Sequence, residues 1–294
     1  MVKIGAKRTI FRQIGIFDGI NNFLMICVVI IAAYPFLYVL ANSLSSPMFV
    51  LQGKVVLIPK GFTTDAYVLA FQKIPIAKAY INTIKYVTLG TALNILLTIL
   101  TAYPLSRKGF YGKPIFTFII MFTMFFSGGL IPTYLVVKKL GMVNTTWAIV
   151  LPLMINVWNL IVTKTFLQTI PESLIEAAQI DGASEFGILA IIIIPLSKVI
   201  IATMVLFYAV DHWNSFFWPM IYLNDPDKYP VQLLLRQILI ESTGDGNANY
   251  EGMDVIQENL KYACVIIAII PIVCVYPFVQ KYFVKGIMIG SVKG

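Results

Sequence analysis

Six long apolar runs, separated by polar or proline-containing segments, dominate the hydropathy pattern of this chain. The runs cover residues 23–41, 86–105, 115–137, 146–163, 186–210 and 262–280. Each is close to the roughly 20 residues that an α-helix needs to cross the hydrocarbon core of a bilayer. The alternation of apolar and polar residues that a membrane barrel requires is not seen. The pattern predicts an all-α polytopic membrane protein with six transmembrane helices.

Helix-breaking residues in the third and fifth runs predict breaks there. The third includes Ser127-Gly128-Gly129 and Pro132, and the fifth includes Pro195, so we expect a kink in each. Lys198 follows Pro195 and has two interpretations: its side chain snorkels to the lipid headgroups at a break near the inner interface, or it marks a functional site. The first run resembles a cleavable signal, but its length and the runs that follow favour an uncleaved span.

Composition and charge agree with a membrane protein and indicate its orientation. Of 294 residues, 59% are hydrophobic and 12% are charged, against about a quarter charged in soluble domains. Lysine and arginine are dense in the N-terminus, the 106–113 turn and the tail, and sparse in segments 43–79 and 211–261. The positive-inside rule therefore predicts that the protein lies in the plasma membrane with both termini in the cytoplasm and these two segments outside. The net charge of +8 reports orientation, not nucleic-acid binding.

The predicted domain organisation follows the spans. Residues 1–79 form an N-terminal cytoplasmic segment, the first span and an outer loop. Residues 80–285 form a transmembrane core with spans two to six and an outer loop at 211–261. Residues 286–294 form a cytoplasmic tail.

A polar stretch at residues 170–184, between the fourth and fifth runs, has the pattern of a short helix. Pro171 suits the first helical position, Glu172 favours the helix dipole, and Gly182 suits the turn that ends a helix. One face carries Leu174, Ile175 and Ala178, and the other carries Glu172, Glu176 and Gln179. Because glutamates four residues apart repel each other, we expect a basic partner surface. The stretch predicts a cytoplasmic docking helix at about 171–185.

Several kinds of chemistry are excluded by the residues present. No segment matches the phosphate-binding pattern G-x-x-x-x-G-K-[ST]. The single histidine, His212, excludes a histidine-rich metal motif, and we expect no Ser-His-Asp triad. We therefore expect no catalytic residue, no metal site and no cofactor in this chain, and we expect that it is not an enzyme. If ATP powers transport, another subunit must bind it.

Polar and aromatic residues in the fourth and fifth runs are candidates for a substrate path: Asn156, Asn159, Asp211, Trp213 and Asn214. Sugars stack on aromatic rings and need amide or carboxylate partners, so these residues would suit a sugar path. Two alternatives remain open. The amides of Asn156 and Asn159 can bridge helices, and Asp211, Trp213 and Asn214 can belong to an interfacial belt.

The docking stretch resembles the EAA loop of ABC importer permeases. The resemblance lies in Glu176-Ala177-Ala178, then Asp181-Gly182-Ala183, then Ile192 and Ile194-Pro195. The segments 126–134, 212–215 and 286–294 resemble the carbohydrate-uptake branch, in particular the smaller, maltose-permease-G-like subunit of oligosaccharide permeases common in Gram-positive bacteria. Ile194 stands where the family usually has leucine, and Val199 where a second proline is common, which leaves the bend there less defined.

The resemblance implies a machine of several subunits. This chain would pair with a second, similar permease, with two ATPase subunits that bind ATP and Mg inside, and with an extracellular solute-binding lipoprotein that delivers an oligosaccharide. The residues implied to contact an ATPase are Glu176, Ala177, Ala178, Asp181, Gly182 and Ala183. An alternative function is a stand-alone secondary transporter or channel for a small polar solute, although only Lys198 is a candidate intramembrane charge. The sugar is undetermined: neutral and acidic oligosaccharides both fit.

Overall fold

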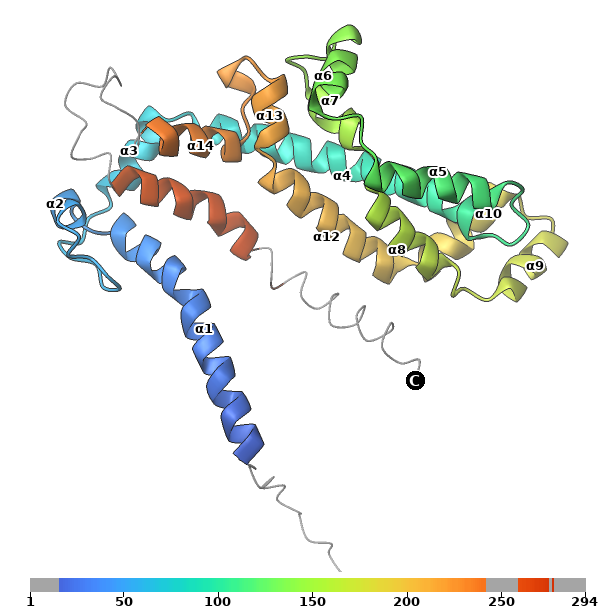
Figure 1. Ribbon diagram of the computed structural model, residues 1–294, viewed down its shortest axis with the longest axis horizontal. Helices are drawn as coiled ribbons and strands as arrows, with labels where there is room; N and C mark the ends of the chain where they lie inside the picture. The colour runs from blue at the N-terminus through green and yellow to red at the C-terminus, as the bar shows by residue number, and fades with distance from the viewer. Residues whose placement is uncertain (1–15, 242–258, 275–276, 278–294) are drawn as a thin grey trace, which may run out of the picture. The chain divides into compact units, whose positions relative to one another are not determined.

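The computed structural model describes residues 16–241, 259–274 and 277 (Figure 1). Every regular element in these residues is a helix, which confirms the predicted all-α class. The chain separates into two compact units, one made of residues 1–67 with 250–266 and the other of residues 68–249 with 267–294.

The first unit is built around α1 (Ile16–Ser43), which contains the first predicted span. No side chain in the most apolar window of this helix is buried, and apolar residues on all sides are typical of a helix in a membrane. Beyond α1, the short α2 (Pro47–Leu51) and a following loop place Val50 and Val55 against Ala41 and Tyr262. Asn259 fixes this end further, because its amide donates to the carbonyl of Ser45.

Three long helices form the centre of the second unit. Figure 1 shows α4 (Ile76–Ser106) running beside α12 (Lys198–Asn214) and α8 (Val157–Leu167). The second predicted span therefore begins too late, because α4 starts at Ile76 instead of Tyr86. The ten residues before Tyr86 include polar side chains, yet Ile76, Ala79 and Thr83 are buried there, so tertiary packing extends the helix beyond the apolar run.

The third, fourth and fifth predicted spans are bent helix pairs. The bends are 111° between α5 (Lys113–Phe125) and α6 (Leu130–Lys139), 51° between α7 (Thr146–Val150) with η1 (Leu151–Leu153) and α8, and 82° before α12. The elements before α12 are α10 (Glu185–Ile188), the π-turn η2 (Leu189–Ile193) and α11 (Ile194–Leu196). The break at 126–129 confirms the kink predicted from Ser127-Gly128-Gly129, and the fifth run bends at Ser197, just after Pro195.

The segments predicted as outer loops are partly helical. Segment 43–79 contains α2, α3 (Asp65–Lys73) and the start of α4. Segment 211–261 contains the end of α12, then α13 (Phe217–Tyr222), η3 (Pro226–Lys228) and α14 (Val231–Glu241), before residues 242–258, which lie outside the described residues. Within α14, Val231, Leu233 and Leu235 are buried, so tertiary packing holds this part of the segment.

Among the described residues, two helices are long and apolar enough to cross a membrane, or five if each bent pair is one span. The two are Phe17–Ser43 and Ile76–Ser106. The sixth predicted span begins in the helix Asn259–Cys274, and most of its remainder, like the 286–294 tail, lies outside the described residues.

Candidate functional site

The docking stretch forms α9 (Glu172–Ile180), a helix between α8 and α10, as the sequence predicts. It is shorter than the predicted 171–185, because Pro171 is its N-cap and Gly182 ends it. It ends in the double hydrogen bond of a Schellman motif. The N–H of Gly182 donates to the carbonyl of Gln179 at 3.0 Å, and the N–H of Ala183 donates to the carbonyl of Ala178 at 2.9 Å. Gly182 has φ +79°, the left-handed conformation expected of it. The end of α9 is thus defined by one glycine.

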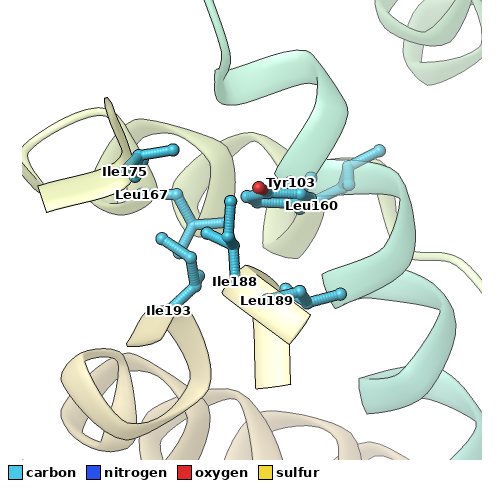
Figure 2. Close-up of a cluster of buried hydrophobic side chains, with 8 residues drawn as sticks. Tyr103, Leu160, Leu167, Ile175, Ile188, Leu189 and Ile193 are labelled. Atoms are coloured by element: carbon cyan, nitrogen blue, oxygen red, sulfur yellow. The ribbon is translucent and has the colours of Figure 1, made fainter. Parts of the chain in front are cut away.

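The apolar face of α9 is held by a buried cluster. Ile175, 4% exposed, packs into a group that also contains Leu167 of α8, Ile188 of α10 and Tyr103 of α4. Figure 2 shows these side chains pointing toward one another from several helices. The cluster fixes α9 against the end of α4 as well as against the helices that flank it in the sequence.

The N-terminal end of α9 is held by an ion pair. Arg107 Nη1 lies 3.2 Å from Glu172 Oε1, and Lys108 Nζ lies 3.6 Å from Glu172 Oε2. The Arg107 and Glu172 side chains are 17% and 30% exposed, so this pair is better shielded from solvent than the pair to Lys108, which is 85% exposed. The expectation that a partner supplies the basic surface is therefore wrong at Glu172, because the chain's own 106–113 turn supplies it.

The C-terminal end of α9 is held by a second polar group. Glu185 accepts a hydrogen bond from the Tyr103 hydroxyl at 2.6 Å on Oε2 and one from the Gln179 amide at 2.9 Å on Oε1. Both carboxylate oxygens are thus engaged, one by α4 and one by α9. A cavity of about 830 Å³ lies between these groups, and Glu176, Arg107 and Glu185 are among its lining residues.

The residues predicted to contact an ATPase lie at the surface of α9 and the turn after it. Glu176, Ala177, Asp181, Gly182 and Ala183 are exposed, and Ala178 is half-buried. Three large apolar side chains accompany them: Leu174, Ile180 and Phe186 are 44%, 87% and 76% exposed. Exposed apolar side chains beside polar ones are typical of an interaction surface.

A second cavity, of about 320 Å³, lies between the break that precedes α8 and the C-terminal end of α12. Its polar lining residues are Asn94, Asn156, Tyr208, Asp211, His212, Asn214 and Ser215, and its aromatic rings are Phe216, Phe217 and Trp218. This volume is at the lower end of the range of small-molecule sites. Carboxylate, amide and ring surfaces together suit a polyhydroxylated ligand.

The structure brings together three of the five path candidates and separates the other two. Asn156, Asp211 and Asn214 line the cavity. Asn159 does not; it is 6% exposed, and its N–H donates to Asn156 Oδ1 at 3.1 Å, a cap that starts α8. Trp213 does not line it either, and its ring packs 6.1 Å from the ring of Tyr80, centroid to centroid.

One side of the cavity is formed by a buried amide, Asn94 of α4. Its Nδ2 donates to the carbonyls of Leu153 and Met154, each at 2.8 Å, in the break between η1 and α8. With both amide hydrogens used, its Oδ1 must accept, so the nitrogen that lies 2.7 Å away, His212 Nε2, carries a hydrogen. Asn94 therefore forms hydrogen bonds with carbonyls that have no helical partner in the break before α8. Through His212 it also connects α12 to this break.

Two further contacts support this junction. The Tyr208 hydroxyl lies 2.7 Å from Thr98 Oγ1 of α4 and accepts from the Asn156 N–H at 3.4 Å. Gly90 gives the His212 ring its space, because a Cβ at that position would lie 2.4 Å from Nε2.

Sequence reasoning missed Asn94 and Tyr208 and did not include His212 among the path candidates. An amide in the middle of a predicted span is itself an indication, since polar groups at membrane depth need partners. The same rule applied to Asn156 and Asn159 extends to Asn94. Nothing in the sequence pairs Asn94 with a histidine 118 positions later.

We expect Trp213→Ala to lower the thermal stability of the protein and to leave the KM for substrate uptake unchanged. Trp213 is half-buried against Tyr80 and lies outside the cavity. Its neighbour Asn214 lines the cavity, so Asn214→Ala is the matched variant and should raise KM with little change in melting temperature. Thermal unfolding of the purified protein and initial uptake rates measure both, and a raised KM for Trp213→Ala would contradict the assignment.

Comparison with known proteins places this architecture in a family. Residues 94–289 match the family model described as "Binding-protein-dependent transport system inner membrane component". The polygalacturonan/rhamnogalacturonan transport system permease protein YtcP of Bacillus subtilis is 43% identical over 291 residues, 98% of this chain and 100% of that protein. Protein LplC of the same organism is 42% identical over 281 residues, 95% of each chain.

A solved structure shares the fold. It is described as a bacterial ABC transporter involved in the import of the acidic polysaccharide alginate, and one of its chains superposes with a TM-score of 0.86 at 32% identity, covering 96% of this chain and 100% of that one. The family model spans well over half of this sequence, and its members are inner-membrane transport components and not enzymes. This multi-pass membrane protein therefore belongs to the binding-protein-dependent transport system inner membrane component family.

Proposed function

We propose that this chain is the permease subunit of an ATP-driven importer for an acidic oligosaccharide of the uronate type. The observation that carries the proposal is the 320 Å³ cavity, where Asn156, Asp211 and Asn214 meet the rings of Phe216 and Trp218. Amide and carboxylate groups pair with sugar hydroxyls, and rings stack on sugar faces. The substrate class comes from the relatives, because one is named for polygalacturonan and a solved neighbour for alginate.

The charge of the cavity supports a path in preference to a tight binding site. Asp211 supplies the carboxylate in the cavity lining. This group accepts hydrogen bonds from sugar hydroxyls and repels the carboxylates of a uronate. A path must bind its cargo strongly enough to admit it and weakly enough to release it. Selectivity then rests first with the extracellular solute-binding lipoprotein that delivers the sugar.

The proposed topology has six spans, with both termini and α9 in the cytoplasm. The ion pair of Glu172 with Arg107 supports this, since it places α9 on the same side as the basic 106–113 turn. The exposed surface of α9, with Glu176, Asp181 and the Gly182 turn, then meets one of two ATPase subunits that bind ATP and Mg. A second, similar permease completes the path.

Reconstitution of the complete complex in proteoliposomes tests this function. The complex contains this chain, its second permease, the ATPases and the binding protein, and we expect galacturonate oligomers to stimulate ATP hydrolysis and to be imported, and malto-oligosaccharides of equal length to do neither. Import of the neutral sugar alone would overturn the substrate class and leave the permease function in place. Failure of the chain to co-purify with an ATPase would favour a transporter that acts alone.

A further inference from the structure

We propose that α4 connects α9 to the sugar cavity, with Tyr103 at one end and Asn94 at the other as positioning residues. The inference rests on the proposed function, because it takes α9 as the surface that meets the ATPase. It adds a role for a helix that is remote in sequence from α9 and whose residues are absent from every motif considered above.

One end of α4 is attached to α9 at three points. The Tyr103 hydroxyl donates to Glu185, which also accepts from Gln179 of α9. Arg107, which follows the last residue of α4, pairs with Glu172 at 3.2 Å. Between these polar contacts, Ile175 lies in the buried cluster that contains Tyr103 (Figure 2). A displacement of α9 therefore acts on α4 directly.

The other attachment of α4 lies at the cavity. Asn94 is 1% exposed, and its amide is bonded to the carbonyls of Leu153 and Met154 and to His212 of α12. One turn farther on, Thr98 bonds the Tyr208 hydroxyl. Asn94, Leu153, Tyr208 and His212 all line the cavity, so a shift of α4 changes the cavity's shape.

The segment between the two ends is one uninterrupted helix. Asn94 and Tyr103 lie nine residues apart within α4, which corresponds to about 14 Å at 1.5 Å per residue. The 51° bend lies at the cavity, before α8, and the 82° bend lies at Ser197, where α12 begins, whereas α4 is continuous from Ile76 to Ser106. A continuous helix transmits a displacement over this distance, and the broken ones absorb part of it at their bends.

Two substitutions test the connection at its ends in the reconstituted complex. Tyr103→Phe removes the hydroxyl bonded to Glu185 and keeps the ring in the buried cluster. His212→Leu removes the donor to Asn94. The measured quantity is the number of sugar molecules imported per ATP hydrolysed, and we expect each variant to lower it about tenfold, a typical size for a coupling effect.

The double variant decides between one connection and two independent defects. If α4 links the ends, Tyr103→Phe with His212→Leu loses no more than the more severe single variant, because the link is already broken. Multiplied losses, about a hundredfold in the double variant, would overturn the inference. His212→Gln keeps an N–H donor near the position of Nε2 and should restore the ratio.

Matched controls separate this role from general damage. Tyr86→Phe removes a hydroxyl from the same helix that donates to the Lys228 carbonyl at 2.8 Å, away from both Asn94 and Tyr103. This variant should keep the wild-type ratio of sugar imported to ATP hydrolysed. A loss as large as that of Tyr103→Phe would contradict the inference. Should His212→Leu fail to accumulate, Thr98→Val takes its place in the cycle, since it removes the contact with Tyr208 and keeps a similar shape.

The same experiment distinguishes the two proposals. A wild-type complex that imports a different sugar overturns the substrate class. The single and double variants are then compared with that sugar. A wild-type complex that neither hydrolyses ATP nor imports any sugar overturns the proposed function and this inference with it.

Discussion

Gly182→Leu is expected to reduce uptake below a tenth of the wild-type rate and to weaken the association with the ATPase, while the protein stays in the membrane. Gly182 has φ +79°, and the left-handed conformation costs a residue with a Cβ roughly 1–2 kcal/mol. No atom lies within 4 Å of the position of a Cβ there, so the effect comes from the backbone and not from a clash. To escape the strain, the turn must give up the bonds to Gln179 and Ala178 that end α9.

Gly141→Leu is the matched control for this prediction. Gly141 has φ +67° and equally open surroundings, but it lies in the turn after α6, away from α9. The Gly141→Leu protein should tolerate the backbone strain and retain most of the wild-type uptake rate. Uptake rates in proteoliposomes and the amount of ATPase that co-purifies measure both variants, and equal losses in the two would show that left-handed strain anywhere is harmful and remove the special role of Gly182.

Gly90→Ala is expected to destabilise the protein, although glycine to alanine within a helix normally stabilises by about 1 kcal/mol. The added Cβ would lie 2.4 Å from His212 Nε2, far inside contact distance. The ring cannot move without breaking its bond to Asn94, and an unpaired buried polar group costs about 1–3 kcal/mol. The free energy lost in packing and hydrogen bonding exceeds the gain in helix propensity. The substitution therefore lowers the stability instead of raising it.

Gly19→Ala, in α1, supplies the comparison for Gly90→Ala. Its Cβ would meet nothing within 4 Å, so the propensity gain should appear undiminished. The melting temperature of each purified variant is the measurement. A melting temperature for Gly90→Ala at or above the wild-type value would show that His212 and Asn94 rearrange without cost.

The parts of the structure that the sequence predicts are those with local causes. α9 begins after Pro171 and is terminated by the turn at Gly182, and both residues act within one turn of the helix. The break after α5 follows from Ser127-Gly128-Gly129 for the same reason. In each case the backbone preferences of a few adjacent residues settle the outcome.

The parts that the sequence does not predict depend on contacts between distant segments. Glu172 appeared to need a basic partner, and the pairing with Arg107 across 65 positions is visible only in the fold. α4 extends to Ile76 because its early polar turns are buried against other helices, which an apolar-run criterion does not detect. Asn94 and His212 likewise acquire their roles only when α4 and α12 lie side by side.

The two polar attachments of α9 bear on how the complex assembles. A segment that orders only on contact with its partner loses affinity to the entropy of ordering. Here the ion pair of Glu172 and the bonds of Glu185 hold α9 in place before any ATPase arrives. If α9 is the surface that meets the ATPase, as proposed above, that surface is preorganised and binding needs no folding step.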